Sequence, residues 1–287
     1  VTLEKNIGKK SFGKQLWRFI TRRKTLFLGI LFVTAISLIA IFANQLAPYD
    51  PIQTDYQAVL KPPGTSSHLL GTDKFGRDIL SRIIIASRID LSIGIICVLF
   101  PFVFGCVVGA ISGYYGGVTD ALLMRFVDIS VAFPFYVLVI TILAVLGPGL
   151  LNMYIALILV GWIAYAKIIR GEILVAKNQE YVLAARALGY SDWRILIRHL
   201  LPNTISQTVV FAMSDIVMVI MAGASLGFLG LGVQPPRPEW GVEIANGREF
   251  ITIAPWLAIF PGLSLAVVGI AFSLLGDGLS GLLRPKD

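Results

Sequence analysis

The sequence predicts an all-α polytopic membrane protein with six transmembrane helices and both termini in the cytoplasm. Hydrophobic residues make up 56% of the 287-residue chain and charged residues only 14%, and the mean hydropathy is +0.80. Soluble domains carry about 25% charged residues, and a soluble fold could not bury this much apolar surface. Six apolar runs are interpreted as membrane spans: 25–47, 91–112, 126–146, 151–166, 205–228 and 255–275.

The distribution of basic residues predicts the orientation. Eight Lys or Arg residues fall within residues 1–24, which we expect to be a cytoplasmic basic amphipathic segment ahead of transmembrane helix 25–47. Six spans place both termini on one side, and the segments of that side hold 17 Lys and Arg residues against 7 on the other. The positive-inside rule therefore assigns the termini to the cytoplasm. Residues 48–88 become a periplasmic or extracellular segment, and 89–287 the remaining membrane core.

Local signals refine two of these segments. Pro134 lies within the third span, and its missing N–H favours a kink. In the outer segment, Thr72 or Asp73 is expected to cap a helix that runs towards Arg88.

Residues 178–203 form a charged segment between two apolar runs, and the topology places this loop in the cytoplasm between spans 4 and 5. Its first part predicts a short helix over 181–188. Gly189 can take the left-handed conformation that ends such a helix.

The second part of this loop predicts another short helix, running to about Leu201. Ser191 or Asp192 can cap its start. Pro202 lacks a donor and limits how the helix continues into the fifth span. The expected result is two helices joined at a bend, a compact projection on the inner face.

The motifs of common enzyme sites are missing from the sequence. It contains no G-x-x-x-x-G-K-[ST] for a nucleotide, no H-E-x-x-H and no G-x-S-x-G. The two histidines, His68 and His199, fall on opposite sides of the membrane in this topology. We therefore expect a non-catalytic chain without a cofactor or metal of its own.

Asp215 lies near the middle of the fifth span, next to Ser214. A carboxylate at that depth costs roughly 2.5–3.5 kcal/mol on insertion scales. Two interpretations stay open. Asp215 and Ser214 face a water-filled pathway, where the carboxylate meets a cation or amino group, or the carboxylate bonds to a neighbouring helix or subunit.

The stretch Leu183–Pro202, LAARALGYSDWRILIRHLLP, resembles the cytoplasmic EAA loop of ABC importer permeases. Five positions match in type and spacing: Ala184, Ala185, Gly189, Leu201 and Pro202. Leu183 stands where the family has its glutamate, and Glu180 lies three residues earlier. Four further motifs, in the same order, are similar to the second permease of dipeptide, oligopeptide and nickel importers: LLGTDKFGRDILSR, GYYGGVTDALLMRFVDI, GFLGLGVQPPRPEWG and APWLAIFPGL…LLGDGL.

This resemblance implies a mechanism and a set of partners. The loop would dock in a cleft of an ATPase subunit, small Ala184 and Ala185 would permit close approach, and arginines would meet acidic or carbonyl groups there. Two ATPase subunits would bind the ATP and Mg, two permease chains would rock, and an external binding protein would deliver the solute. The coupling residues implied are Glu180, Ala184, Ala185, Arg186, Gly189, Asp192, Arg194, Leu201 and Pro202.

The outer segments Leu69–Arg88 and Leu231–Arg248 would meet the binding protein or pack on the sister permease. The outer family motif implied comprises Gly71, Asp73, Gly76, Arg77 and Asp78. The partner permease is expected to be homologous and non-identical, with a homodimer as the alternative, and membrane lipid surrounds the spans. The expected location is the cell membrane of a prokaryote, and no nucleic-acid partner is expected.

The expected solutes are di- or oligopeptides, with nickel or metallophore and glutathione-like solutes as alternatives in the same family. A stand-alone secondary transporter is the rival from another class, and it predicts buried charges in several spans. A membrane-embedded enzyme is the third hypothesis, and it lacks a nucleophile and base.

Overall fold

The computed structural model describes residues 24–65 and 67–283, and every regular element in these residues is helical, which confirms the all-α class. The predicted amphipathic segment 1–24 lies outside the described residues except for Lys24. The elements are α2 (Lys24–Ile41), α3 (Ala43–Leu46), the 3-10 turn η1 (Tyr56–Ala58), α4 (Ile79–Tyr115), α5 (Gly117–Val131), α6 (Phe135–Leu146), α7 (Leu150–Ala176), α8 (Glu180–Ala187), α9 (Asp192–Ile195), the π-helix η2 (Leu196–Leu200), α10 (Leu201–Phe228), α11 (Trp240–Arg248) and α12 (Trp256–Leu283).

Within the described residues, five helices are long and apolar enough to cross a membrane. They are α2, α4, α7, the continuous helix Asp192–Phe228 and α12. A sixth span exists if α5 and α6 are taken together, although their axes are bent by 88°. The six predicted spans are thus found as five helices and one broken pair.

The prediction for the second span was wrong in its extent. Residues 79–115 form one helix of 37 residues, so the predicted outer helix and the span after it are continuous. At about 1.5 Å per residue this helix is far longer than a bilayer core of about 30 Å. Its cap is Asp78, whose side chain accepts from Ser81 N at 2.8 Å, and neither Thr72 nor Asp73.

The third span is broken where the proline predicts a kink, but far more sharply than a kink implies. The helical pattern stops after Val131, and Pro134 precedes the first residue of α6. The segment predicted as a loop after span 2 is also helical, because α5 begins at Gly117. Only Gly116 separates it from α4, and both glycines take positive φ values of 66° and 55°.

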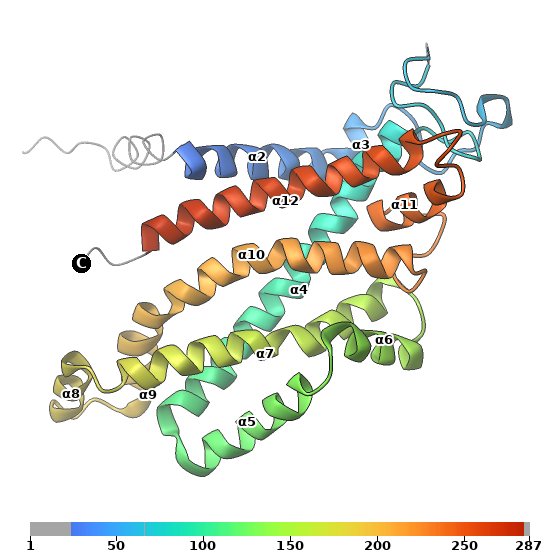
Figure 1. Cartoon of the computed structure of the whole chain (residues 1–287). Coiled ribbons are helices and arrows are strands. Elements are labelled where there is room, and N and C mark those ends of the chain that lie inside the picture. Colours follow the sequence, from blue (N-terminus) through green and yellow to red (C-terminus); the bar gives the residue numbers. More distant parts are fainter. Residues whose placement is uncertain (1–23, 66, 284–287) are drawn as a thin grey trace, which may run out of the picture.

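The helices run roughly side by side, with the loops gathered at two opposite ends (Figure 1). The start of α2, the end of α12 and the pair α8–α9 lie at one end of the bundle. The chain before α4 and the segment around α11 lie at the other (Figure 1). The first and last described residues therefore lie at the same end of the bundle as the loop 178–203.

The tightest packing joins α4 to α7 through three glycines spaced four residues apart, Gly105, Gly109 and Gly113, which share one face of α4. A Cβ built on Gly105 would lie 2.5 Å from the Trp162 carbonyl oxygen, and one on Gly109 would be closer still to that of Ala166. The backbones of the two helices therefore approach more closely than any side chain at these positions allows.

Replacing Gly109 with leucine should push α4 and α7 apart and destabilise the protein by roughly 3 kcal/mol or more, since the obstacle is backbone and cannot rotate away. Gly171 of α7 is the matched control, because an added Cβ there meets nothing within 4 Å. Gly171→Ala should be neutral or stabilising by up to about 1 kcal/mol. Apparent Tm values of the purified proteins in detergent measure both, and equal values would contradict the close approach.

Candidate functional site

The loop 178–203 contains the predicted bend, and Gly189 forms it as expected. Helix α8 ends with Gly189 at φ 76°. The Gly189 N–H donates to Arg186 O at 3.0 Å and the Tyr190 N–H to Ala185 O at 3.2 Å. This bonding is a Schellman motif, which satisfies the last carbonyl groups of the helix.

The second helix of the loop begins after Ser191 but does not end near Leu201, as predicted. Instead α9 passes through η2 directly into α10, so that 192–228 form one helix. The π turn bonds Leu201 N to Leu196 O, which shifts the hydrogen-bond register immediately before Pro202. The wider turn accommodates a residue that has no N–H to donate.

Tyr114, near the C-terminal end of α4, binds both halves of the loop, and the sequence analysis missed it. Its hydroxyl donates to Asp192 Oδ1 at 2.5 Å and accepts from Arg186 Nη2 at 3.4 Å. The Arg186 guanidinium also lies 5.7 Å from the centroid of the tyrosine ring. Arg186 and Asp192 are thus held by this chain itself, whereas Arg186 was expected to meet a partner.

Arg194 also has a contact within the loop, since its guanidinium lies 4.2 Å from the ring centroid of Tyr190. The Tyr190 ring in turn stacks on His199 at 5.7 Å. These contacts stiffen the bend around Gly189.

The two alanines of the motif face opposite ways. Ala185 is buried, with 4% of its surface exposed, in a cluster that includes Ile169 and Ile173 of α7. Ala184 is exposed, as are Glu180 and Pro202, and Leu201 is half-buried. Of the pair expected to permit close approach, only Ala184 is therefore available to a partner.

Five large apolar side chains are exposed on the loop among its charged residues, a feature that the sequence analysis did not single out. Trp193 is 59% exposed and Leu188 is 73% exposed, although both lie in a charged segment. We name this set the inner apolar surface: Tyr181, Leu183, Leu188, Trp193 and Ile197. Leu183, which stands where the family has glutamate, is part of it.

Asp215 is bonded within the chain. Its Oδ2 accepts from the Tyr165 hydroxyl of α7 at 2.6 Å, which agrees with the interpretation of a carboxylate bonded to a neighbouring helix. Ser214 points elsewhere and is exposed. The two neighbours, predicted as one pathway site, lie on different faces of α10.

The outer motif is largely buried. Gly71 and Gly76 take positive φ values of 81° and 75°, and Asp73 Oδ2 accepts from Arg77 Nε at 2.6 Å. Asp78 pairs with His68 at 2.9 Å besides capping α4. These five motif residues build the fold of the outer segment, and their side chains leave little surface for a binding protein.

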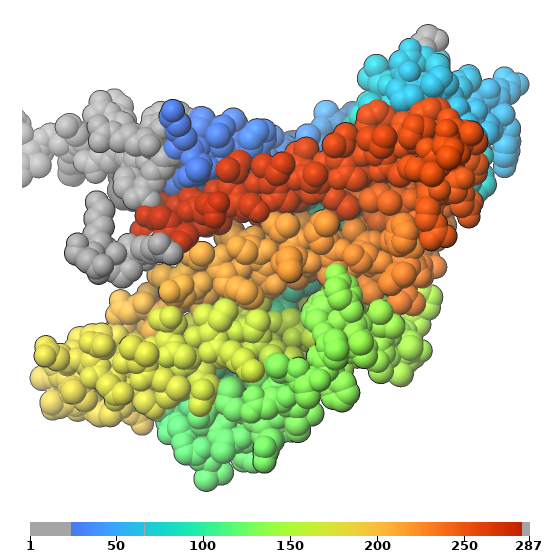
Figure 2. Space-filling model, viewed as in Figure 1, coloured from blue at the N-terminus to red at the C-terminus, as the bar shows by residue number. Residues whose placement is uncertain are grey.

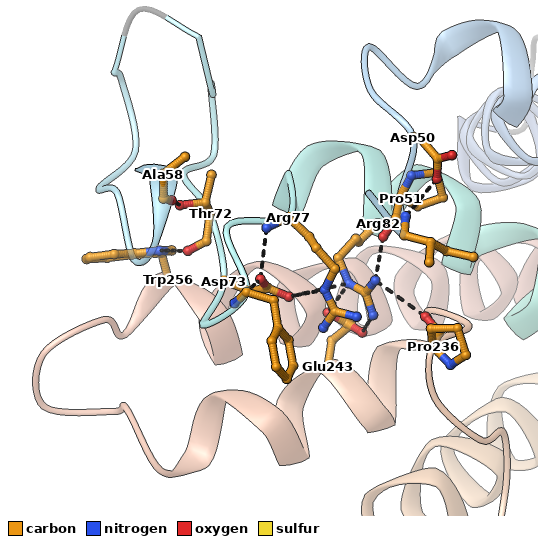
Figure 3. Close-up of polar contacts among 12 residues, drawn as sticks. Asp50, Pro51, Ala58, Thr72, Asp73, Arg77, Arg82, Pro236, Glu243 and Trp256 are labelled. Atoms are coloured by element: carbon orange, nitrogen blue, oxygen red, sulfur yellow. Dashed lines mark hydrogen bonds and ion pairs between the residues drawn. The ribbon is translucent and has the colours of Figure 1, made fainter. Parts of the chain in front are cut away.

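Arg82 joins the outer segments to each other (Figure 3). Its Nε and Nη2 donate to the two carboxylate oxygens of Glu243 on α11, at 2.9 and 2.6 Å. Its Nη1 donates to the Pro51 carbonyl at 2.6 Å. With 1% of its surface exposed, this arginine is a fully buried connection among three segments distant in sequence.

Glu239 starts α11 and is also fully buried. Its carboxylate oxygens accept from Gly241 N and Val242 N at 2.7 and 2.9 Å. Asp90 of α4 lies beside it and accepts from Trp240 N at 3.3 Å. Burial raises the pKa of Glu239 from 4.5 to about 7, although these N–H groups oppose the shift. No three His, Cys, Asp or Glu side chains in the described residues are placed to hold a metal.

Comparison with known proteins identifies the family. Residues 105–286 match the family described as binding-protein-dependent transport system inner membrane component. Residues 11–63 match the N-terminal transmembrane domain of oligopeptide transport permease C. The chain belongs to the family of binding-protein-dependent transport system inner membrane components. It is a multi-pass protein of the bacterial inner membrane and a permease subunit of an ABC importer, as the resemblance implied.

Two relatives extend over nearly the whole chain. A glutathione transport system permease protein of Pectobacterium atrosepticum is 42% identical, covering 95% of this chain and 91% of its own. A dipeptide transport system permease protein of Alkalihalophilus pseudofirmus is 38% identical, covering 95% and 90%. Among solved structures, an inward-facing MetNI methionine ABC transporter matches with a TM-score of 0.59 at 17% identity, over 72% of this chain and 98% of that one. This last likeness shows the fold alone.

The raised pKa of Glu239 predicts a pH dependence of stability. This pKa is higher in the folded than in the unfolded chain. The contribution of the Glu239 carboxyl to the free energy of unfolding is therefore complete below about pH 4.5 and is lost as the pH rises through about 7. Glu239→Gln should remove that part of the pH dependence of the apparent Tm. The exposed Glu249 is the control, and Glu249→Gln should leave the profile unchanged. A Glu239→Gln profile equal to the parent's would show that this carboxyl does not titrate in that range.

Proposed function

We propose that this permease chain takes up short peptides or closely related solutes, and that its inner apolar surface couples it to an ATPase subunit. The structure of the loop 178–203 is the observation that supports this proposed coupling. The loop is a stiffened two-helix projection with five large exposed apolar side chains, in a sequence without a P-loop motif for a nucleotide. Apolar exposure of this kind on a projecting loop is typical of a protein interface.

The orientation follows from the charge distribution. The end of the bundle that carries α8–α9 is the cytoplasmic end, since the flanking segments there are rich in Lys and Arg. The opposite end, around α11, faces outward and meets the binding protein through its exposed residues, including Gln234, Pro236 and Arg237.

The partner permease is proposed to be homologous and non-identical, and two ATPase subunits hydrolyse the ATP. Closure of these subunits on ATP moves both loops, and the two permease chains rock between inward-open and outward-open states. The solute class is inferred from the dipeptide and glutathione permeases among the relatives.

The contacts of Tyr114 suggest how movement reaches the spans. Helix α4 runs from the loop to the outer segment, and Tyr114 joins its inner end to both α8 and α9 through Arg186 and Asp192. At the outer end, Arg82 joins the same helix to α11. A displacement of the loop is therefore transmitted along one continuous helix to the outer mouth.

Reconstitution tests the proposed function. Proteoliposomes that contain this chain, its sister permease and the ATPase subunits should take up peptide only with ATP and binding protein. Trp193→Glu should abolish both uptake and ATPase co-purification, because it places a charge in the apolar contact. Val175→Glu, at an exposed site near the end of α7, is the control and should retain both. Uptake that needs no ATPase subunit would favour a secondary transporter instead.

Tyr114→Phe should uncouple ATP hydrolysis from transport. The change keeps the ring but removes a hydrogen bond to a carboxylate, typically worth roughly 1.5–3 kcal/mol. We expect the ATPase subunits to remain bound while solute moved per ATP falls about fivefold or more. The neighbouring Tyr115 is 52% exposed, so Tyr115→Phe is a matched control. The same transport-to-hydrolysis ratio in both variants would refute a transmitting role for Tyr114.

A further inference from the structure

One face of α10 has no covering element among the described residues. It lies on the side of the helix opposite α4, and α10 is visible there between α12 and α7 (Figure 2). Residues of α10 that face α4 include Ile216, Ile220 and Gly223. The exposed side chains of the open face are Asn203, Gln207, Ser214, Met218, Met221, Ser225 and Phe228.

The composition of this face differs from that of the other exposed helix faces. Between residues 95 and 107 of α4, and between 259 and 270 of α12, all exposed residues are apolar. On α10 four of the seven are polar and two are methionines. Faces of the first kind suit lipid, and the face of α10 does not.

The polar groups on this face would make contact with lipid costly in free energy. Gln207 and Ser214 have no side-chain hydrogen bond within the described chain, whereas Ser225 donates to Met221 O at 2.8 Å. An unpaired amide or hydroxyl in hydrocarbon costs roughly 2–7 kcal/mol. The part of the open face that carries Gln207 and Ser214 therefore meets water or polar groups.

A hollow of about 380 Å³ opens at the outer part of this face, between α10, α11 and α12. Gly241 brings α11 against the Ala224 backbone, where an added Cβ would overlap. The lining is apolar apart from Ser225, and comprises Met221, Ala224, Ser225, Phe228, Leu229, Gly241, Ile244 and Leu265.

The positively charged side chain of Arg248 lies next to this hollow. The Arg248 guanidinium lies 5.7 Å from the ring centroid of Phe228, which itself lines the hollow. Arg248 is exposed and forms no ion pair within the described residues. The adjacent Glu249 is 4.0 Å from Lys74 instead.

We propose that this hollow is a subsite for the translocated solute, in which an apolar side chain occupies the hollow while Arg248 binds a free carboxylate. The matching chemistry is that of a short peptide with an apolar C-terminal residue. This inference rests on the proposed function, because it places the solute on the pathway of the same permease.

The residues suit such a solute in size and in selectivity. The hollow falls within the usual range of about 300–1,000 Å³ for ligand sites, and methionine adapts to side chains of different shape. The planar guanidinium is the side chain that binds carboxylates in a forked geometry. Together these residues would recognise the carboxyl terminus while tolerating different apolar side chains.

Uptake of Ala-Phe and of its C-terminal amide tests the subsite in the reconstituted complex. Arg248→Ala should lower the rate ratio of acid to amide about fivefold relative to the parent chain, and Arg248→Lys should restore part of it. The selectivity of the binding protein cancels, since it is the same in each assay. Arg125→Ala, at an exposed arginine of α5 far from the hollow in sequence, should leave the ratio unchanged.

The outcomes separate the two proposals. If the parent complex takes up neither compound with ATP, the proposed peptide function fails and the subsite falls with it. If the parent takes up Ala-Phe and Arg248→Ala keeps the ratio, the subsite alone is refuted.

Cysteine labelling tests the hollow without requiring transport. The native Cys97 and Cys106 are 1% and 6% exposed, so an added thiol can be followed. Met221→Cys should react with a membrane-impermeant maleimide, and millimolar Ala-Phe should slow the reaction several-fold. Leu263→Cys, on the apolar face of α12, should not react. A thiol at position 221 that is unreactive, or that peptide does not protect, would show that lipid or the sister permease covers the hollow.

Discussion

The close approach of α4 to α7 is the constraint on which the other arrangements depend. Between apolar helices in a bilayer, the hydrophobic effect supplies little attraction, so that packing and polar contacts must hold the bundle together. The three glycines Gly105, Gly109 and Gly113 allow backbone-to-backbone contact along much of the interface. Helix α4 is thereby packed closely on α7, and the polar contacts at its two ends act on one continuous helix.

Those two ends differ in chemistry. At the outer end, a buried arginine-carboxylate pair joins α4 to α11, and such a pair specifies one arrangement because leaving either charge unpaired is costly. At the inner end, one tyrosine hydroxyl joins α4 to the loop through contacts that are partly exposed. The first junction is therefore the costlier of the two to break.

The faces of helix α10 make different kinds of contact. One side packs on α4 and another holds Asp215 against Tyr165, so the acid that stands out most in the sequence is satisfied internally. The open face instead carries amide, hydroxyl and thioether groups beside an apolar hollow. Weak and adaptable contacts of this kind suit a solute that must bind and then leave.

The sequence by itself determined the helical membrane class, the approximate positions of the spans, the bend at Gly189 and a kink near Pro134, though not the full 88° break there. Each feature follows from hydropathy or from a backbone preference that neighbouring residues in the sequence determine. Only the tertiary structure decided that α4 is one long helix, that Ala185 and the outer motif are buried, and that Tyr114 and Arg82 join α4 to distant segments. Arg82 and Glu243 are 161 residues apart, and burial and pairing over such separations depend on how helices pack rather than on any local pattern.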